Sequence, residues 1–256
     1  MSAITVVVHP DPATLATATA ARLLVRLIDA QSVHRPVHAV LTGGGLGIRV
    51  LTEVAASPLR DVVDWSGVHL WWGDERYLPT GHPDRNETQA REALLDALPI
   101  PPANIHPIPA ADAPGIGSPE DAAAAYAAEL AAFVVADDPA AASDDAGPAV
   151  PVFDVLLLGM GPDGHIASLF PGHEAVRVVD RTVVGVHDSP KPPPERVSLT
   201  YPAIEAAEEV WLVVAGADKS AAAGRALAGD PVDDVPASGA CGRSRTLWLL
   251  DLAATR

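Results

Sequence analysis

The strongest constraint on the fold is a predominantly apolar run from Phe153 to Leu158 that ends in a cluster of glycines. Its length and composition are typical of a strand buried on both faces, as in a parallel sheet covered by helices. The run breaks at Gly159, Gly161 and Gly164, and we expect residues 166–170 to open a helical turn. Open α/β sheets bind ligands where strands end and helices begin, so this break is a candidate site.

The same alternation recurs along the chain. The predicted strands are 4–8, 37–41, 68–72, 105–108, 153–158, 181–187, 210–215 and 246–250. The predicted helices are 12–29, 46–56, 86–98, 118–135, one from about 201, and 218–227. This order predicts a three-layer α/β protein, with a mostly parallel, Rossmann-like sheet and helices on both faces. The turns that follow the strands would then converge on the carboxyl edge of the sheet.

Length and composition favour one α/β domain that spans residues 1–256, since 48% hydrophobic residues can supply a substantial core. The acidic, Ala/Pro/Ser-rich stretch 137–150 is predicted to be a mobile surface insertion. Cys241 is the only cysteine, which excludes an intrachain disulfide and a cysteine-based metal cluster. We expect neither a metal nor a cofactor.

The net charge of −16 argues against a nucleic-acid partner, which needs a basic stripe. An anionic small substrate remains compatible, because a local cluster of arginines can overcome a diffuse negative field. No apolar run approaches the ~20 residues of a membrane span, and the N-terminus lacks the features of a signal peptide. We therefore expect a cytoplasmic protein without a membrane partner, a monomer by default, with a homodimer left open.

Asp163 and His165 lie inside the glycine-rich break after the central strand. Histidine ionises near neutral pH, which suits a general acid or base. The alternative is that His165 caps a helix or satisfies a loop carbonyl. A histidine beside an aspartate in a strand-to-helix turn favours the functional interpretation.

Three other strand ends carry candidate residues. Gly43, Gly44 and Gly45 follow a strand without forming a phosphate-binding P-loop motif, and they indicate either a backbone cradle for an oxygen or a tight turn. The next strand runs into three charged residues, which form either a solvated loop or a site. The candidates in this charged segment are Asp74 and Arg76. Asn86 is expected to cap the helix that follows, and Lys219 is a candidate after the strand 210–215. The segment 189–195 is predicted to be a stiff extended spacer.

Taken together, these motifs resemble the 6-phosphogluconolactonase family, in the family's order and over most of the chain. They are T-G-G-G at 42–45, W-G-D-E-R at 72–76, Asn86, L-G-M-G-P-D-G-H-I-A-S-L-F-P-G at 158–172, R-V-S-L-T at 196–200 and G-A-D-K at 216–219. P-A-S at 236–238 and W-L-L-D at 248–251 resemble the family too. The resemblance implies the fold of glucosamine-6-phosphate deaminases and ribose-5-phosphate isomerases. It also implies hydrolysis of 6-phospho-D-glucono-1,5-lactone, the second step of the oxidative pentose phosphate pathway.

Two alternatives are weighed against this activity. The related deaminases continue their D-G-H-I-A segment with F-N-E-P-G, whereas this chain has Phe170 in place of that glutamate. The departure disfavours a sugar-phosphate isomerase or deaminase. A non-catalytic sugar-phosphate sensor of the kind fused to transcriptional regulators would need a DNA-binding segment, for which we find no spare length.

For the lactonase, we expect His165 to activate water as a general base and Asp163 to orient it or the loop. Phosphate binding is assigned to Arg76, Arg196 and Lys219 with help from glycine backbone. Backbone N–H groups around Gly43, Gly44 and Gly45, or at Gly161, are candidate donors to the oxyanion. Asp74 and Asn86 are expected to bind sugar hydroxyls or to brace Arg76.

Overall fold

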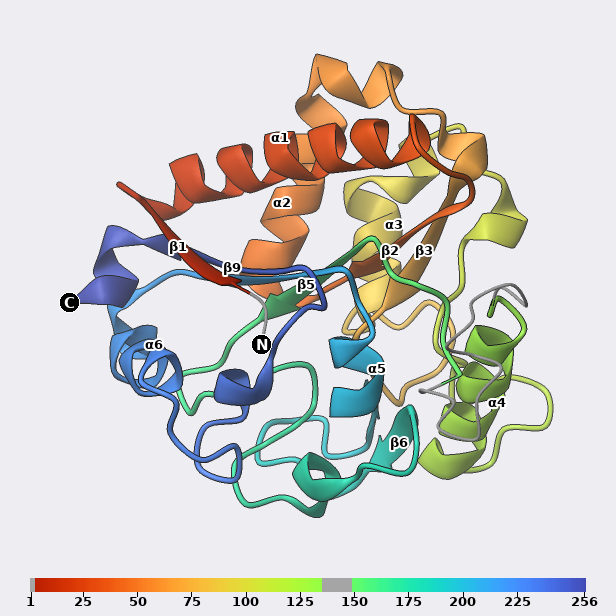
Figure 1. The fold of residues 1–256 in the computed structure, drawn as a ribbon. Helices are drawn as coiled ribbons and strands as arrows, with labels where there is room; N and C mark the ends of the chain where they lie inside the picture. The colour runs from red at the N-terminus through yellow and green to blue at the C-terminus, as the bar shows by residue number, and fades with distance from the viewer. Residues whose placement is uncertain (1–2, 135–148) are drawn as a thin grey trace.

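A six-stranded parallel sheet lies at the centre of the computed structural model, which describes residues 3–134 and 149–256 (Figure 1). The strands lie in the order β1 (Ala3–His9), β9 (Arg245–Asp251), β8 (Glu209–Val214), β5 (Val155–Gly159), β2 (Val37–Leu41) and β3 (Val68–Trp72). Each neighbouring pair in this sheet is parallel. The predicted fold class is therefore confirmed. Of the predicted surface insertion, residues 137–148 lie outside the described part of the chain.

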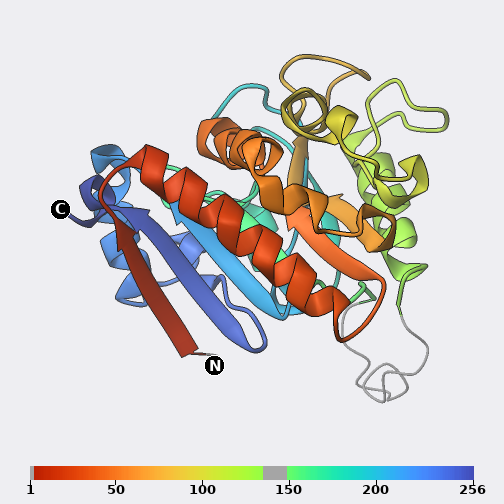
Figure 2. The same ribbon diagram turned by 90° about the horizontal axis from the view of Figure 1, so that it is seen from above.

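Helices cover both faces of this sheet (Figures 1 and 2). Helices α1 (Pro12–Gln31) and α2 (Gly44–Ala56) lie on one face, and α5 (Tyr201–Glu205) and α6 (Ser220–Leu227) lie on the other. Helix α1 begins as its sequence predicts, because the Asp11 side chain accepts a hydrogen bond from the N–H of Thr14 and proline follows the cap. Its leucines face the sheet and are buried.

A second, three-stranded antiparallel sheet packs beside the first. It contains β4 (Asp74–Arg76), β7 (Arg196–Leu199) and β6 (Val183–Val186), with α4 (Pro119–Ala131) against it and α3 (Asn86–Ala93) nearby. Of the two alternatives for the charged residues after β3, the solvated loop is wrong, since Asp74–Arg76 forms the strand β4. Alternate side chains of a strand point to opposite sides, so Glu75 turns inward and is 1% exposed.

The predicted helical turn at 166–170 is also wrong. Ile166 forms isolated β-bridges with Met160 and Leu169, and the backbone at Ala167 is left-handed, with φ of 47°. The side chains of Ile166, Leu169 and Phe170 are buried in the core. Tertiary packing thus overrides the local helical pattern, and the glycine-rich turn after β5 leads into an irregular loop.

Other differences concern the lengths of elements. The strand expected at 105–108 is reduced to one bridge between Leu70 and Ile105, because Pro107 and Pro109 lack the N–H that a ladder needs. The helix expected at 118–135 ends at Ala131, and the one expected at 86–98 ends at Ala93. The segment 189–195 turns back on itself instead of extending, because the Ser189 N–H donates to the carbonyl of Pro194 at 3.1 Å.

One cluster of buried apolar side chains runs through both sheets and includes Trp71, Trp72, Trp211 and Tyr126. Within the described ranges, no helix combines the length and apolar character needed to cross a membrane. The core therefore fixes the relative positions of β4, β5 and β7, whose ends carry the polar residues of the next section.

Candidate active site

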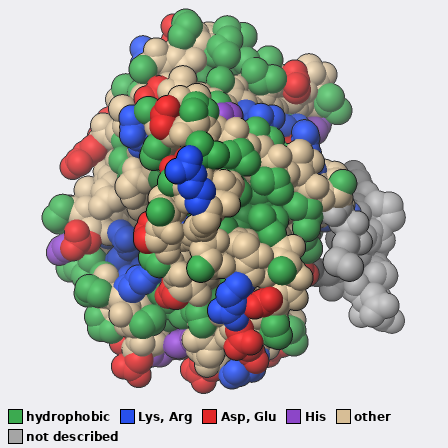
Figure 3. Space-filling view, turned by 90° about the vertical axis from the view of Figure 1, so that its left-hand side faces the viewer, with side chains coloured by type: hydrophobic (Ala, Val, Ile, Leu, Met, Phe, Trp, Pro, Cys, Tyr) green, Lys and Arg blue, Asp and Glu red, His purple; other side chains and the backbone are tan. Residues whose placement is uncertain are grey.

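A cleft of about 240 Å³ opens at the carboxyl edge of the central sheet. Every predicted site residue except Asp163 lines it, and Asp163 contacts His165 directly. The charged side chains in the lining are Arg76, Lys191, Arg196, Lys219 and Asp74. Figure 3 views this edge, and Lys and Arg side chains (blue) show on it. The cleft thus carries more positive than negative side chains in a chain whose net charge is −16.

A larger cavity of about 660 Å³ lies between α4 and β6. Alanine, valine and glycine supply much of its lining, and none of the predicted site residues contributes to it. We therefore assign the chemistry to the smaller cleft, where titratable groups and glycine backbone converge.

Asp163 and His165 form a close pair in the loop that follows β5. The imidazole Nδ1 lies 2.6 Å from Asp163 Oδ1, and the side chain of His165 is 17% exposed. An ionised carboxylate only accepts hydrogen bonds, so Asp163 fixes the proton on Nδ1 and leaves Nε2 with its lone pair. No described residue bonds Nε2. The ring of Phe170 packs on the imidazole with centroids 4.6 Å apart, which fixes the plane of the ring.

The backbone around this pair is tight. Gly161 donates its N–H to the carbonyl of His165 at 3.0 Å, and a Cβ on Gly161 would lie 2.1 Å from His165 Nδ1. Gly164 has φ of 84°, a region that glycine adopts at little cost. The position of the imidazole therefore requires glycine at 161, whereas the backbone conformation favours glycine at 164.

Lys191 is a site residue that the sequence interpretation missed. Its Nζ lies 3.4 Å from Asp163 Oδ1 and 3.2 Å from His165 Nδ1. Partial burial raises the pKa of Asp163, but the hydrogen bond from His165 and the charges of His165 and Lys191 outweigh it, so the net pKa lies well below its usual range. The only local signal was the rarity of lysine in the chain, which has two.

The turn from β2 into α2 presents unpaired backbone donors. Helix α2 starts at Gly44, two residues earlier than predicted, and Gly43 at its N-cap supplies no side-chain hydrogen bond. Gly44 has φ of 78°. The first N–H groups of a helix without a side-chain cap, together with the helix dipole, favour an anion or a polarised oxygen.

Asn86 does not cap α3 as predicted. Its Nδ2 donates to the backbone carbonyl of Asp74 at 2.8 Å, and its side chain lies against Gly43, where a Cβ would meet Oδ1 at 1.9 Å. Asp74 Oδ2 accepts a hydrogen bond from Ser168 Oγ at 2.7 Å. Asn86 and Ser168 thus hold the Asp74 carboxylate at the wall of the cleft.

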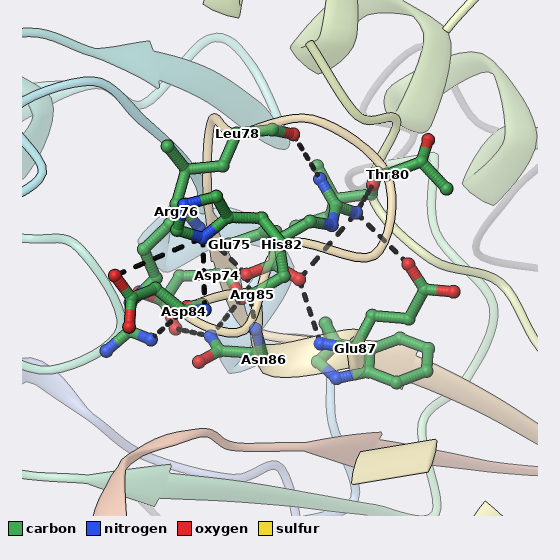
Figure 4. Close-up of polar contacts among 12 residues, drawn as sticks. Asp74, Glu75, Arg76, Leu78, Thr80, His82, Asp84, Arg85, Asn86 and Glu87 are labelled. Carbon is green, nitrogen blue, oxygen red and sulfur yellow. Dashed lines mark hydrogen bonds and ion pairs between the residues drawn. The ribbon is translucent and has the colours of Figure 1, made fainter. Parts of the chain in front are cut away.

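The helix is capped instead by Glu75, a second residue that sequence analysis did not place (Figure 4). Its carboxylate accepts from the N–H groups of Arg76 at 2.9 Å, Asn86 at 2.6 Å and Glu87 at 2.9 Å. Burial raises the pKa of Glu75 to about 7, against the opposing effects of Arg85 and these N–H groups. Glu75 ties β4 to the start of α3.

The three predicted phosphate ligands have different surroundings. Arg76 donates from Nη1 to the carbonyl of Asp84 at 2.6 Å. Arg196 is 5% exposed, and its Nε and Nη2 donate to carbonyls of residues 191–193. Burial lowers the pKa of Lys219, which is half-buried in the short 3-10 turn Ala217–Lys219 that follows β8. All three line the cleft, but two of the three guanidinium nitrogens of Arg196 already donate to backbone carbonyls.

Comparison with known proteins agrees with this architecture. A family model described as glucosamine-6-phosphate isomerases/6-phosphogluconolactonase matches residues 10–248. The chain is 55% identical over 248 residues to 6-phosphogluconolactonase of Streptomyces coelicolor, covering 97% of this chain and 92% of that protein. It is 47% identical over 245 residues to the Mycobacterium tuberculosis protein of the same name, with 95% and 94% covered. The chain belongs to the 6-phosphogluconolactonase family. It is an enzyme of that family, as the sequence motifs predict.

Solved structures show the same fold. The 6-phosphogluconolactonase of Trypanosoma brucei superposes with a TM-score of 0.81 at 30% identity, covering 99% of this chain and 98% of that one. A monomeric glucosamine-6-phosphate deaminase reaches a TM-score of 0.75 at 17% identity, which demonstrates a shared fold alone. The choice between lactone and amino-sugar chemistry therefore depends on the residues of the cleft.

Proposed function

We propose that the protein hydrolyses 6-phospho-D-glucono-1,5-lactone to 6-phospho-D-gluconate, the second step of the oxidative pentose phosphate pathway. One observation carries the proposal: an imidazole oriented by a carboxylate shares a small cleft with four cationic side chains. The imidazole suits attack of water on a lactone carbonyl, and the cations suit a phosphate. The 55% identity to a curated lactonase supports the same substrate.

In the proposed reaction, His165 Nε2 takes a proton from a water molecule as the water oxygen attacks C1 of the lactone. Asp163 stabilises the imidazolium that forms, because its carboxylate lies 2.6 Å from Nδ1. The bond between C1 and the ring oxygen then breaks. The imidazolium returns its proton to the departing ring oxygen, which leaves a hydroxyl group and a carboxylic acid. The acid releases the remaining proton of the water to solvent, and the product leaves as a carboxylate.

Charge develops on the carbonyl oxygen of C1 during the attack. We assign its stabilisation to backbone N–H groups of Gly43, Gly44 and Gly45 at the start of α2. The Gly161 N–H, the other predicted donor, already donates to the carbonyl of His165. The donors at the start of α2 are fixed before the substrate arrives, since the turn is held by Thr42 Oγ1, which accepts from the N–H of Gly159 at 3.1 Å. Lactones are reactive esters, and general-base help of ~10²–10⁴-fold suits such a substrate.

We assign the phosphate to Arg76, Arg196 and Lys219. We add Lys191 to this set because it lines the same cleft, beside the Asp163 carboxylate. Arg196 would use Nη1, since its other nitrogens already donate to carbonyls. Asp74 would bind a sugar hydroxyl, with Asn86 bracing it.

The proposal also includes the localisation, domain organisation and partners of the enzyme. We infer that it works in the cytoplasm as a single domain on a small-molecule substrate, without a nucleic-acid or membrane partner. We infer a monomer, with a homodimer as the alternative.

The test is turnover of freshly prepared 6-phosphoglucono-δ-lactone, with the spontaneous opening of the ring subtracted, beside glucosamine 6-phosphate as the competing substrate. The proposal predicts rapid lactone hydrolysis and no ammonia from the amino sugar. Ammonia release would instead favour a deaminase. Thermal stabilisation by 6-phosphogluconate without any turnover would favour a sensor and overturn the enzyme proposal.

A further inference from the structure

A histidine outside the catalytic loop joins three elements of the structure. His187 follows β6, and its Nε2 lies 2.6 Å from Glu120 Oε1 in the first turn of α4. Its Nδ1 lies 2.6 Å from Glu195 Oε2, just before β7. Both ring nitrogens therefore contact carboxylates at hydrogen-bond distance.

This geometry specifies the charge of the ring. Ionised carboxylates only accept hydrogen bonds, and a neutral imidazole has a single N–H to donate. The hydrogen bond of Nε2 to Glu120 and the carboxylate of Glu195 2.6 Å from Nδ1 together favour the imidazolium form of His187. The hydrogen bond to Glu120, with the charges of both glutamates, raises the pKa of His187 against partial burial. The same hydrogen bond lowers the pKa of Glu120.

The protein backbone leaves room for this contact. Gly185 lies on β6, two residues before His187. A Cβ on Gly185 would lie 2.7 Å from Glu120 Oε1. The carboxylate of Glu120 is thus packed against the strand and aimed at the imidazole.

Other titratable groups surround the pair of glutamates. Tyr77 lies close enough that Asp121, Glu120 and Glu195 add to burial in raising its pKa. Two further titratable residues lie next to His187. His173 Nε2 contacts the backbone carbonyl of His187 at 2.9 Å, and Asp188 is the next residue in the chain. The acidic character of these neighbours favours the charged ring, and no Lys or Arg contacts it among the described residues.

Residues 188–195, which we call the strap, connect this histidine to the active site. Lys191 on the strap reaches Asp163 and His165, at 3.4 Å and 3.2 Å. Arg196 donates to the carbonyls of Lys191, Pro192 and Pro193, which anchors one side of the strap. The contact between His187 and Glu195 anchors its end.

We propose that His187 is a positioning residue whose protonated ring fastens the strap, so that Lys191 is held beside the Asp163–His165 pair at low pH and released as the pH rises. The sign follows from the raised pKa: stabilisation is complete below the pKa of the free imidazole and is lost as the pH rises through the pKa of the folded protein. The consequence for catalysis rests on the function proposed above; the fastening of the strap does not.

The strap gives a readout that is independent of activity. The Ser189 N–H donates to the carbonyl of Pro194, so its hydrogen exchange, corrected for intrinsic pH dependence, reports whether the strap is closed. In the wild type we expect protection of this amide to fall about two- to fivefold between pH 6 and pH 9, the factor that one or two exposed ion pairs supply. NMR titration of the ring should place the pKa of His187 above 6.5.

Substitutions separate charge from packing. His187→Gln should lower the protection of Ser189 already at pH 6, whereas His187→Arg, whose guanidinium stays charged, should preserve it at pH 9. His34→Gln is a matched control, since it removes another half-exposed histidine–carboxylate contact, to Asp154, near the amino ends of the strands. It should leave the exchange of Ser189 unchanged.

Equal protection of Ser189 in the wild type at both pH values would overturn the proposal, as would wild-type protection in His187→Gln at pH 6. If His187→Arg lost as much protection of the Ser189 amide at pH 9 as the wild type, the charge of the imidazole would not be the cause of the pH dependence, and the proposal would fail. In the activity arm, His187→Gln should raise KM for the lactone about two- to fivefold with little change in kcat. Absence of all lactonase activity would refute the proposed function, and the exchange result would still stand.

Discussion

The contact between Gly161 and the imidazole gives a sharp prediction. An alanine at position 161 would place its Cβ 2.1 Å from His165 Nδ1, 2.2 Å from Cε1 and 2.5 Å from Asp163 Oδ1. Ordinary van der Waals contact begins at 3.4 Å, so the ring must move by about 1.3 Å. A misplacement of about 1 Å can cost ~10²-fold in rate. We therefore expect Gly161→Ala to lower kcat/KM for the lactone about 100-fold, or about 2.7 kcal/mol in the activation free energy.

The assay is initial-rate hydrolysis of the phosphorylated lactone, with circular dichroism to verify that the variant folds. Gly224→Ala in α6, outside the cleft, is the control glycine substitution, because no described atom outside its own helix lies within 4 Å of its added Cβ. It should retain activity within a few-fold of the wild type. A folded Gly161→Ala variant with more than a third of wild-type kcat/KM would refute the assignment of the imidazole as the base.

Three further predictions concern the oriented base, acid stability and the core. Asp163→Asn should lower kcat at least 10²-fold with little change in the melting temperature, because the amide can donate to Nδ1 and select the wrong tautomer of His165; unchanged kcat would contradict the role of the carboxylate. Burial lowers the pKa of His38 to about 3, so on acidification the histidine binds a proton in the unfolded chain before it does so in the folded protein. The free energy of unfolding therefore falls as the pH drops below 6.5, by about 2 kcal/mol at pH 5. Urea unfolding at pH 7 and pH 5 should show this loss in the wild type and less of it in His38→Gln; equal losses would exclude the histidine as its source. Tyr126→Phe should cost about 1–3 kcal/mol, because the buried hydroxyl accepts from the Trp72 N–H at 2.9 Å and donates to its carbonyl at 3.1 Å; an unchanged urea midpoint would contradict this.

The central sheet was predictable because its signals are local. The runs at 37–41 and 68–72 match β2 and β3 without change, since strands covered on both faces are mostly apolar, with one histidine in each here. The start of α1 was equally predictable, because Asp11 and the proline that follows it act on their own turn. The order of strands and helices then sufficed to predict one edge where the glycine and charged turns meet.

The parts that could not be predicted depend on partners far along the chain. Asp74–Arg76 forms a strand because it pairs with Arg196–Leu199, more than a hundred residues away. Residues 166–170 have a helical pattern, yet their apolar side chains are needed in the core. Lys191 reaches the imidazole because the strap turns back on itself. The proline-rich sequence of the strap instead predicts an extended spacer.

The buried carboxylate of Glu75 shows the same limit. Three consecutive charged residues after a strand are typical of a solvated loop, and nothing local distinguishes the one that turns inward. Of the three N–H groups that compensate its burial, two come from Asn86 and Glu87, where the chain returns, and one from the neighbouring Arg76.

The most direct test of the central claim is the hydrolysis of 6-phosphoglucono-δ-lactone by the wild type and by His165→Ala side by side, corrected for spontaneous ring opening. The account predicts rapid turnover in the wild type and a loss of about 10²–10⁴-fold in kcat/KM in the variant, the usual contribution of a general base. Wild-type kcat/KM in a folded His165→Ala would contradict the account, whatever the other variants show.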